Sequence, residues 1–407
     1  MKATQSELSF KISSCKGCLS KNLESWFSLG KQPPANALLK NLKQKEYFFP
    51  LEVCVCKDCG LVQLKHVVDP KLLFGDYVYF SSTAPSFVKH FEDFAQEVFR
   101  KAKLKKGDLV VDIGSNDGIL LLPFKKLGAK VVGIEPASKI AKVAISKGIP
   151  TVNSFFSVKV AKKVVRTFPK KAKVVTATNV FAHIYDLEEV VRGVKELLTD
   201  DGLFIVENPY LWEMVEQGTF DLVYHEHLFY YDITGLSSIL NRMGMKVVDF
   251  EKVPVHGGSF RYYISKDLKK KPAKRILDAL KKERQWRKTR KMSNFSKKLE
   301  VNKSRLLKLF KNLKLQKKVA VGYGAPAKAS TILNFFQIDK GDLKFIVDDS
   351  PAKQNKYLPG VHIPILATDK LFQENPDYVL ILAWNFAEPI TQKLREQNYK
   401  GTIITPF

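Results

Sequence analysis

The first side chains in this sequence that are suited to chemistry are its cysteines. All five cysteines lie within the first 59 residues, and two pairs, Cys15 with Cys18 and Cys56 with Cys59, have CxxC spacing. This spacing lets two thiolates reach one metal ion from a tight turn, and two such turns supply four sulfur ligands. The cysteines therefore predict a closed, tetrahedral zinc site with a structural role.

Other uses of the cysteines stay open at this point. Disulfides need an oxidising compartment, but the segment Met1–Glu7 lacks the apolar core of a secretory signal, and no later stretch is suited to span a bilayer. A thioredoxin-like redox pair needs only one CxxC. Cys54 lies two residues before Cys56 and is able to replace it as a ligand, although the CxxC spacing favours Cys56. We expect a reduced, cytoplasmic protein with no membrane partner.

A second chemical signal is a glycine-containing turn after the apolar run 109–113, which is predicted to be a buried strand. Glycines at such a turn let a ligand approach the backbone. The acids Asp112 and Asp117 would repel a pyrophosphate but suit a sulfonium cation, and the GxGxxG of a dinucleotide site is missing. Glu135 ends the next strand, where an acid binds ribose hydroxyls. The turn predicts an S-adenosylmethionine site formed by Asp112, Gly114, Asn116, Asp117, Gly118, Glu135 and Asn179.

Histidines follow two later strands of the same predicted sheet. The segment 179–184 contains His183, and the segment 220–228 contains Tyr-His-Glu-His. Because the carboxyl ends of parallel strands meet at one edge, these side chains are expected to lie near the methyl donor. A single histidine is most often structural, and a metal site would need HExxH spacing on a helix. Imidazole titrates near neutrality, which favours acid–base catalysis.

The elements that must position these residues alternate between strand and helix. The predicted elements are a helix over 85–104, strands over 109–113, 131–135, 174–177 and 202–207, and later strands over 319–322, 343–348 and 378–382. Such alternation predicts an α/β fold with two doubly wound, Rossmann-like domains preceded by a small zinc-binding module. We expect four parts: a cysteine module over 1–75, a methyltransferase domain over 76–265, a basic helical linker over 266–318 and a substrate domain over 319–407.

The net charge of +26 points to anionic partners. Much of the lysine excess lies in 266–318, where nucleic-acid binding competes with a solvated helical linker. The second interpretation is favoured, because no aromatic stacking platform or recognition motif accompanies the charge. We therefore expect no nucleic-acid partner.

A second glycine turn, Gly322-x-Gly324-x-x-Ala327, fits a dinucleotide fingerprint better than the first, since Asp348 and Asp349 end the next strand. Taken alone, it suggests a dehydrogenase. Lys328 beside this turn, and Arg261 in the loop 256–261, are also suited to meet a diphosphate.

Taken together, the motifs resemble the C-methyltransferase family that acts on nucleotide-linked keto-deoxysugars. The segments that carry the resemblance are Cys56–Leu64, Asp76–Ser82, Asp112–Gly118, Tyr224–His227, His256–Arg261, Gly322–Lys328 and Leu358–Ile365. The chain departs from the family pattern at Leu19, where a zinc knuckle usually has glycine, at the extra Cys54 and at Asn355. The resemblance demotes the dehydrogenase interpretation of the second glycine turn.

The resemblance also implies roles for individual residues. His227 would be the general base, Glu226 would orient a neighbouring imidazole, and donors to the sugar oxygens would be Tyr224, His183 and one of Tyr77 and Tyr79. We further expect substrate contacts from His225, Asn208, Arg261 and Lys328, with S-adenosylmethionine and structural zinc as cofactors, in a monomer. The competing functions are O- or N-methyl transfer to another small molecule, and a zinc-ribbon protein that binds nucleic acid.

Overall fold

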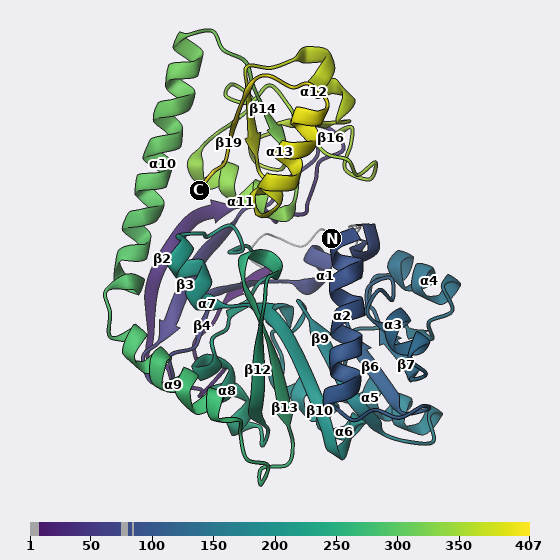
Figure 1. Cartoon of the computed structure of the whole chain (residues 1–407). Helices are drawn as coiled ribbons and strands as arrows, with labels where there is room; N and C mark the ends of the chain where they lie inside the picture. The colour runs from purple at the N-terminus through teal and green to yellow at the C-terminus, as the bar shows by residue number, and fades with distance from the viewer. Residues whose placement is uncertain (1–7, 75–79, 84) are drawn as a thin grey trace.

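The computed structural model describes residues 8–74, 80–83 and 85–407 and consists of three units, with two long helices between the second and the third (Figure 1). The N-terminal unit is a β module, the central unit is the larger α/β domain, and the C-terminal unit is a smaller α/β domain. Along the described part of the chain, no helix has the length and apolar character needed to cross a bilayer.

The N-terminal unit is an antiparallel sheet in the order β11-β4-β3-β2, with a separate β1-β5 pair. Its elements are β1 (Ser9–Lys11), β2 (Leu23–Gln32), β3 (Phe49–Cys56), β4 (Val62–Leu64), β5 (His66–Val68) and α1 (Pro70–Phe74), with β11 (Phe229–Tyr230) added at the edge. Strand β11 comes from far along the chain, directly after the Tyr-His-Glu-His segment. This sheet therefore extends past the module that we expected to end at residue 75.

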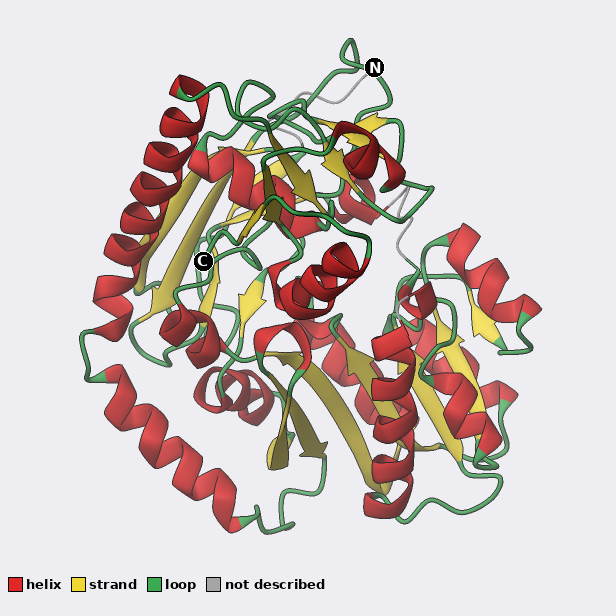
Figure 2. Cartoon of the chain, turned by 45° about the horizontal axis from the view of Figure 1, so that its top comes forward, coloured by secondary structure: helices red, strands yellow, loops and turns green. Residues whose placement is uncertain are grey.

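The central sheet has the order β12-β13-β10-β9-β6-β7-β8 and is parallel except at β13, which runs antiparallel to both neighbours. Its strands are β6 (Leu109–Ile113), β7 (Lys130–Ile134), β8 (Thr151–Val152), β9 (Ala172–Thr178), β10 (Leu198–Pro209), β12 (Lys246–Val253) and β13 (Ser259–Ser265). Strands β6 and β9 are apolar on both faces because helices cover both sides (Figure 2). Those helices are α2 (Pro85–Lys101), α3 (Leu121–Lys126), α4 (Ser138–Ser146), α5 (Val158–Thr167), α6 (Leu187–Leu197), α7 (Leu211–Gln217) and α8 (Ile233–Arg242).

The C-terminal sheet has the order β16-β17-β15-β14-β18-β19, with β16 alone antiparallel among the described strands. Its elements are β14 (Ala320–Tyr323), α11 (Ala327–Phe336), β15 (Ile346–Val347), β16 (Lys356–Tyr357), β17 (Pro364–Leu366), α12 (Asp369–Glu374), β18 (Tyr378–Ile381), α13 (Ala387–Glu396) and β19 (Thr402–Ile404). Two Rossmann-like α/β units after a cysteine module confirm the predicted fold class.

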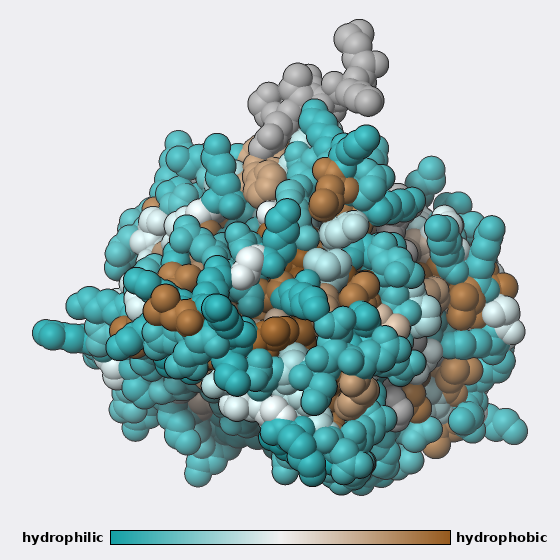
Figure 3. All heavy atoms as spheres, turned by 90° about the horizontal axis from the view of Figure 1, so that it is seen from above, coloured by the Kyte–Doolittle hydropathy of each residue, from teal (hydrophilic) through white to brown (hydrophobic). Residues whose placement is uncertain are grey.

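The basic segment forms two helices, α9 (Lys274–Arg287) and α10 (Lys291–Leu315), and α10 runs along one side of the molecule to the C-terminal unit (Figure 1). Its apolar side is packed: Phe295, Leu306 and Phe310 are buried. The face of the molecule seen in Figure 3 is mostly hydrophilic, with apolar side chains in small separate groups. The lysines thus surround helices that pack against the rest of the chain.

Candidate active site and zinc site

The two CxxC pairs converge on one point. The Sγ atoms of Cys15, Cys18, Cys56 and Cys59 all lie within 4.8 Å of one another. Four thiolates around a zinc ion at about 2.3 Å would be about 3.8 Å apart, and the Cys15–Cys59 and Cys18–Cys56 sulfur distances are both 3.5 Å. The donor set therefore fits zinc. Cys54 lies outside the cluster, where its thiol donates to the Gln63 carbonyl at 3.4 Å.

Each cysteine pair closes with the same backbone hydrogen bond. Leu19 N donates to Cys15 O at 2.9 Å, and Gly60 N donates to Cys56 O at 2.8 Å. Both closing residues have left-handed backbone angles, φ +66° at Leu19 and +77° at Gly60. Glycine adopts this conformation without strain and leucine does not. The leucine that departs from the family pattern nevertheless takes the backbone conformation that the knuckle requires.

The first glycine turn lies at the carboxyl end of β6 and approaches the segment after β9. Gly114 has φ +69°, and a Cβ atom there would come within 2.3 Å of Val180 Cγ2. Glu135, directly after β7, accepts hydrogen bonds from Asn116 N at 3.0 Å and Ala137 N at 2.8 Å. The structure therefore brings the predicted cofactor residues together at one edge of the central sheet, as expected for parallel strands.

The carboxylates of this turn have different partners. Asp112 is buried, accepts a 2.6 Å hydrogen bond from Thr176 Oγ1, and its burial raises its pKa to about 7. Burial also raises the pKa of Glu135. Asp117 is buried too, but its Oδ2 is 2.8 Å from Lys147 Nζ, while Oδ1 has no hydrogen-bond partner among the described residues. An acid oxygen left in this way beside a glycine cradle fits a polar or cationic ligand such as S-adenosylmethionine.

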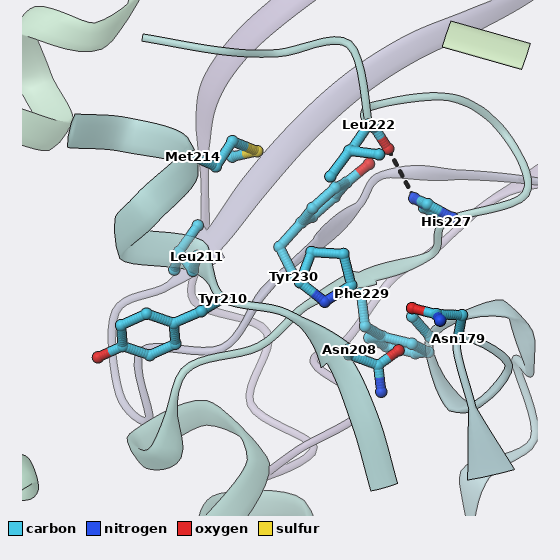
Figure 4. A pocket seen from close by; sticks show the side chains of 11 residues that line it. Asn179, Asn208, Tyr210, Leu211, Met214, Leu222, His227, Phe229 and Tyr230 are labelled. Atoms are coloured by element: carbon cyan, nitrogen blue, oxygen red, sulfur yellow. Dashed lines mark hydrogen bonds between the residues drawn. The ribbon is translucent and has the colours of Figure 1, made fainter. Parts of the chain in front are cut away.

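A pocket opens beyond the carboxyl ends of β9 and β10 (Figure 4). Its lining comes from the end of β10, the segment after β9, helix α7 with the residue before it, the loop before β11 and β11 itself: Asn179, Ala182, Asn208, Pro209, Tyr210, Leu211, Met214, Leu222, His227, Phe229 and Tyr230. Asn179 is predicted to contact the cofactor and His227 to contact the acceptor, so the pocket is lined by residues predicted for both reactants.

The hydrogen bonds of His227 fix its neutral tautomer. Its Nδ1 is 2.7 Å from the Leu222 carbonyl oxygen, which only accepts, so Nδ1 carries the proton (Figure 4). In the neutral ring Nε2 is then an acceptor, and it lies 3.0 Å from the hydroxyl of Tyr224. This arrangement presents a basic nitrogen, with a hydroxyl beside it, at the wall of the pocket.

His183 lies next to His227, with ring centroids 4.7 Å apart. Among the described residues, the ring of Phe74 also stacks on His183, at 5.7 Å. Burial lowers the pKa of His183 to about 4, so this imidazole is neutral at physiological pH. Tyr77 and Tyr79, the other predicted donors, lie outside the described residues.

Glu226 and His225 have partners away from the pocket. Glu226 is buried and accepts a 2.7 Å hydrogen bond from Asn36 Nδ2, while its burial raises its pKa to about 7. His225 Nε2 lies 3.2 Å from the Phe49 carbonyl oxygen, and burial lowers the pKa of this ring to about 4. Among the described residues neither side chain lines the pocket.

The two predicted diphosphate contacts are both engaged in ion pairs. The guanidinium of Arg261 is buried and donates to Glu207 Oε2 at 2.9 Å and Glu97 Oε2 at 2.8 Å. Lys328 Nζ is 3.3 Å from Asp221 Oδ2 and donates to Asn385 Oδ1 at 2.5 Å. Their contact with a diphosphate stays a prediction.

Of the pocket residues, the sequence analysis predicted Asn179, Asn208 and His227 and missed the others, among them the polar Tyr230. Tyr230 is buried, and its hydroxyl has no hydrogen-bond partner among the described residues. Neither amide atom of the predicted Asn208 has one, nor does Asn179 Oδ1. Buried polar atoms in this state indicate groups that a ligand satisfies. The signal for Tyr230 was its place three residues after His227, but an aromatic residue there is equally typical of a core.

Comparisons with known proteins match three consecutive parts of the chain. Family models match residues 15–74 ("Putative zinc binding domain"), 87–249 (methyltransferase domain) and 254–407 (C-methyltransferase C-terminal domain). The C-methyltransferase NovU of Streptomyces niveus is 35% identical over 402 residues, which are 97% of this chain and 96% of that protein.

Solved structures resemble less than half of the chain, and more distantly. A magnesium protoporphyrin IX methyltransferase of Synechocystis is 16% identical, covering 44% of this chain and 82% of that one, with a TM-score of 0.34. An S-adenosylmethionine-dependent methyltransferase of Clostridium acetobutylicum is 15% identical, covering 48% and 94%, with a TM-score of 0.35.

Proposed function

The chain belongs to the C-methyltransferase family, and from that premise we propose that it methylates a ring carbon of a nucleotide-linked keto-deoxysugar. As a member of that family it is an S-adenosylmethionine-dependent enzyme, and zinc is its second cofactor. The acceptor and the mechanism are the proposed parts. The support comes from the pocket, from the resemblance and from the chemistry that carbon methylation demands.

The first step of carbon methylation is the removal of a proton by a base. A ring C–H bond is acidic only beside a carbonyl, so the proton must leave to give an enolate. The single observation that carries the proposal is the tautomer of His227, a residue of the pocket wall: Nδ1–H donates to Leu222 O at 2.7 Å, which leaves Nε2 as the acceptor nitrogen. O- or N-methylation would not require such a base.

Proton removal turns the ring carbon into a nucleophile. His227 Nε2 takes the proton of the carbon next to the keto group, and the C–H electron pair forms the C=C bond while the carbonyl π pair moves to oxygen. Tyr224, His183 and a tyrosine of the 77–79 segment would donate hydrogen bonds to sugar oxygens. When bound, S-adenosylmethionine supplies the electrophilic methyl group that the enolate carbon takes.

The proposed acceptor suits the polar atoms that the pocket leaves unsatisfied. Asn208, Asn179 and Tyr230 place amide and hydroxyl groups there without partners among the described residues, and sugar hydroxyl or keto oxygens would satisfy them. The same proposal includes a role for Glu226 and diphosphate contacts from Arg261 and Lys328. It also includes the fourfold division at residues 75, 265 and 318, the monomeric state and the cytoplasmic location.

His227→Ala tests the mechanism. Turnover is expected to fall by about 10²- to 10⁴-fold, the range for loss of a general base, while S-adenosylmethionine affinity is retained. Wild-type enzyme in D₂O should exchange deuterium into the carbon beside the carbonyl, and His227→Ala should not. His66→Ala, on β5 and outside the pocket, is the matched control. Near-native turnover or exchange by His227→Ala would overturn the assignment.

The acceptor is tested separately. A panel of nucleoside-diphosphate 4-keto-6-deoxyhexoses is incubated with enzyme and S-adenosylmethionine, and products are analysed by mass spectrometry and NMR. A methyl group on carbon supports the proposal. Methylation confined to oxygen or nitrogen, or activity only on compounds that carry no nucleotide, contradicts it.

A further inference from the structure

A buried acid in the loop that carries His227 bonds to the C-terminal domain, beside Phe220, whose ring packs against Phe335, Phe336 and Phe407. Asp221 lies in this loop, between α7 and β11, and its Oδ2 accepts a 2.6 Å hydrogen bond from Trp384 Nε1. The same oxygen is 3.3 Å from Lys328 Nζ. Trp384 belongs to η5 (Trp384–Phe386) and Lys328 to the first turn of α11. Both partners therefore come from the C-terminal domain.

The contact of Asp221 with Lys328 and Trp384 is buried. Asp221 is fully buried, and Lys328 Nζ lies 4.5 Å from the centre of the Trp384 ring and donates to Asn385 Oδ1 at 2.5 Å. Burial lowers the pKa of Lys328, and the nearby charge of Asp221 opposes that shift. Further hydrogen bonds support a buried ion pair, and here Trp384 donates to Asp221 Oδ2 and Lys328 donates to Asn385, while Asp221 Oδ1 has no partner among the described residues.

Asp221 is one peptide unit away from the group that orients the base. The next residue is Leu222, whose carbonyl oxygen accepts the Nδ1–H of His227 at 2.7 Å. A shift of Asp221 would move Leu222 and, with it, the 222–223 peptide that carries this carbonyl. That movement would displace the acceptor that fixes both the tautomer and the aim of the imidazole.

Trp384 also contacts the segment on the other side of the pocket. A Cβ atom on Gly257 would lie 3.2 Å from Trp384 Cη2, and the adjacent Gly258 carbonyl accepts from Tyr210 N at 3.1 Å. Tyr210 lines the pocket. The indole of Trp384 thus lies next to the loop that contains Asp221 and close to the turn that contains Gly257.

We propose that Asp221 is a positioning residue for the general base, held in place by Trp384 and Lys328 of the C-terminal domain. The proposal rests on the proposed function, in which His227 is that base. It gives the C-terminal domain a part in proton abstraction, apart from any contact that it makes with substrate.

Trp384→Phe is the leading test, because it removes the N–H donor and keeps an aromatic ring against Phe407, which lies at 5.5 Å. With the nucleoside-diphosphate 4-keto-6-deoxyhexose that wild-type enzyme methylates fastest, kcat should fall about 10- to 100-fold, the scale for misplacement of a reacting group. KM and S-adenosylmethionine affinity should stay within about twofold, since the base acts after binding. Deuterium exchange at the substrate carbon should slow by the same factor as kcat.

A ligand-free measurement accompanies the kinetics. Backbone amides of residues 219–228 should exchange with D₂O faster in Trp384→Phe than in wild type, while amides of β6 and β9 are unchanged. Trp26→Phe is the matched control, because it removes an equivalent indole bond, 2.8 Å from Nε1 to Met292 O, at a contact away from the pocket. It should retain wild-type kcat.

Substitutions at Asp221 separate the hydrogen bond from general destabilisation. Asp221→Asn keeps an oxygen that accepts from Trp384, so it should retain more kcat than Asp221→Ala. The inference is overturned if Trp384→Phe keeps kcat within about twofold of wild type, or if Trp26→Phe loses as much. Loss of function in Trp384→Phe alongside an active His227→Ala would instead refute the proposed base.

Discussion

At the scale of single residues, burial decides the charge of Glu226. Glu226 follows His225 and precedes His227 in the chain, yet its hydrogen bond is with Asn36 at 2.7 Å. Desolvation raises its pKa to about 7, and the hydrogen bond from Asn36 opposes that rise. The acid is therefore close to half-protonated at neutral pH, in contrast to a carboxylate in water.

This shift predicts a pH dependence of stability. An unfolded glutamate titrates near pH ~4.3, so between that pH and about 7 the unfolded chain loses a proton that folded Glu226 keeps. Stability therefore falls as pH rises through this window, and the loss is complete above it. Glu226→Gln has no proton to lose and still accepts from Asn36, so its free energy of unfolding should exceed wild type by up to ~3 kcal/mol at pH 8.

The measurement is urea unfolding at pH 5 and pH 8, with S-adenosylmethionine affinity as a check on the fold. Glu52→Gln is a suitable control, because Lys65 and Ser25 hold the pKa of Glu52 below its usual range, so that substitution should lose stability at pH 8. A Glu226→Gln variant that is less stable than wild type at pH 8 would contradict the protonated state.

Single residues also show where sequence reasoning succeeds. The spacing of Cys15, Cys18, Cys56 and Cys59 identified the cluster that the structure forms, and Cys54 was expected outside it. The departures at Leu19 and Asn355 were visible, but their consequence was not: both adopt left-handed angles, φ +66° and +61°. Hydrogen-bond partners such as Leu222 O for His227 depend on tertiary geometry and leave no trace in local spacing.

At the scale of elements, most parallel strands were predicted, but the short parallel strands β8, β17 and β19 and the antiparallel strands were not. Strands β6 and β9 are rich in apolar residues because both of their faces are buried. Strand β11 is two residues long and pairs with β4, which lies far earlier in the chain. A segment this short has no periodicity to detect. It nevertheless joins the zinc module to the loop that carries His227.

This pairing predicts that zinc removal reaches the active site. The β3–β4 turn carries Cys56 and Cys59, and Leu64 N donates to Leu228 O at 2.8 Å, next to His227. Removing the ion should unfold the cysteine turns, so β4 should lose its register against β11. Chelation is expected to lower the melting temperature and turnover together, although zinc takes no part in the chemistry.

Metal analysis, circular dichroism and turnover during a chelator titration check this expectation. We expect one zinc per chain in wild type and none in Cys56→Ser. Cys54→Ser is the control, since its sulfur only donates to Gln63 O at 3.4 Å, and it should keep both zinc and activity. Full turnover in zinc-free enzyme would refute the coupling.

At the scale of the whole molecule, the three sequence units are joined by polar contacts. Leu39 pairs with Tyr357 in a β-bridge, and Glu46 accepts from Gly360 N at 2.7 Å. Arg242 Nε donates to Gly17 O at 2.8 Å, which fixes the cysteine turn to α8. Composition and periodicity predicted each unit, but they do not reveal contacts between lone polar residues that lie far apart in the chain.

These contacts predict that the chain unfolds as one unit. S-adenosylhomocysteine at 100 times its Kd should stabilise the folded state by about 2.7 kcal/mol. S-adenosylhomocysteine is expected to bind at the cofactor turn of the central domain. Because the N-terminal module contacts both α/β domains, this ligand should slow exchange of the slowest amides of β14 and β18 as strongly as exchange of those of β6. Glu46→Ala removes the contact with Gly360 and should reduce that protection in β14 and β18 alone. Hydrogen exchange with and without S-adenosylhomocysteine measures this protection. If the ligand leaves exchange in the C-terminal sheet unchanged, the domains unfold independently.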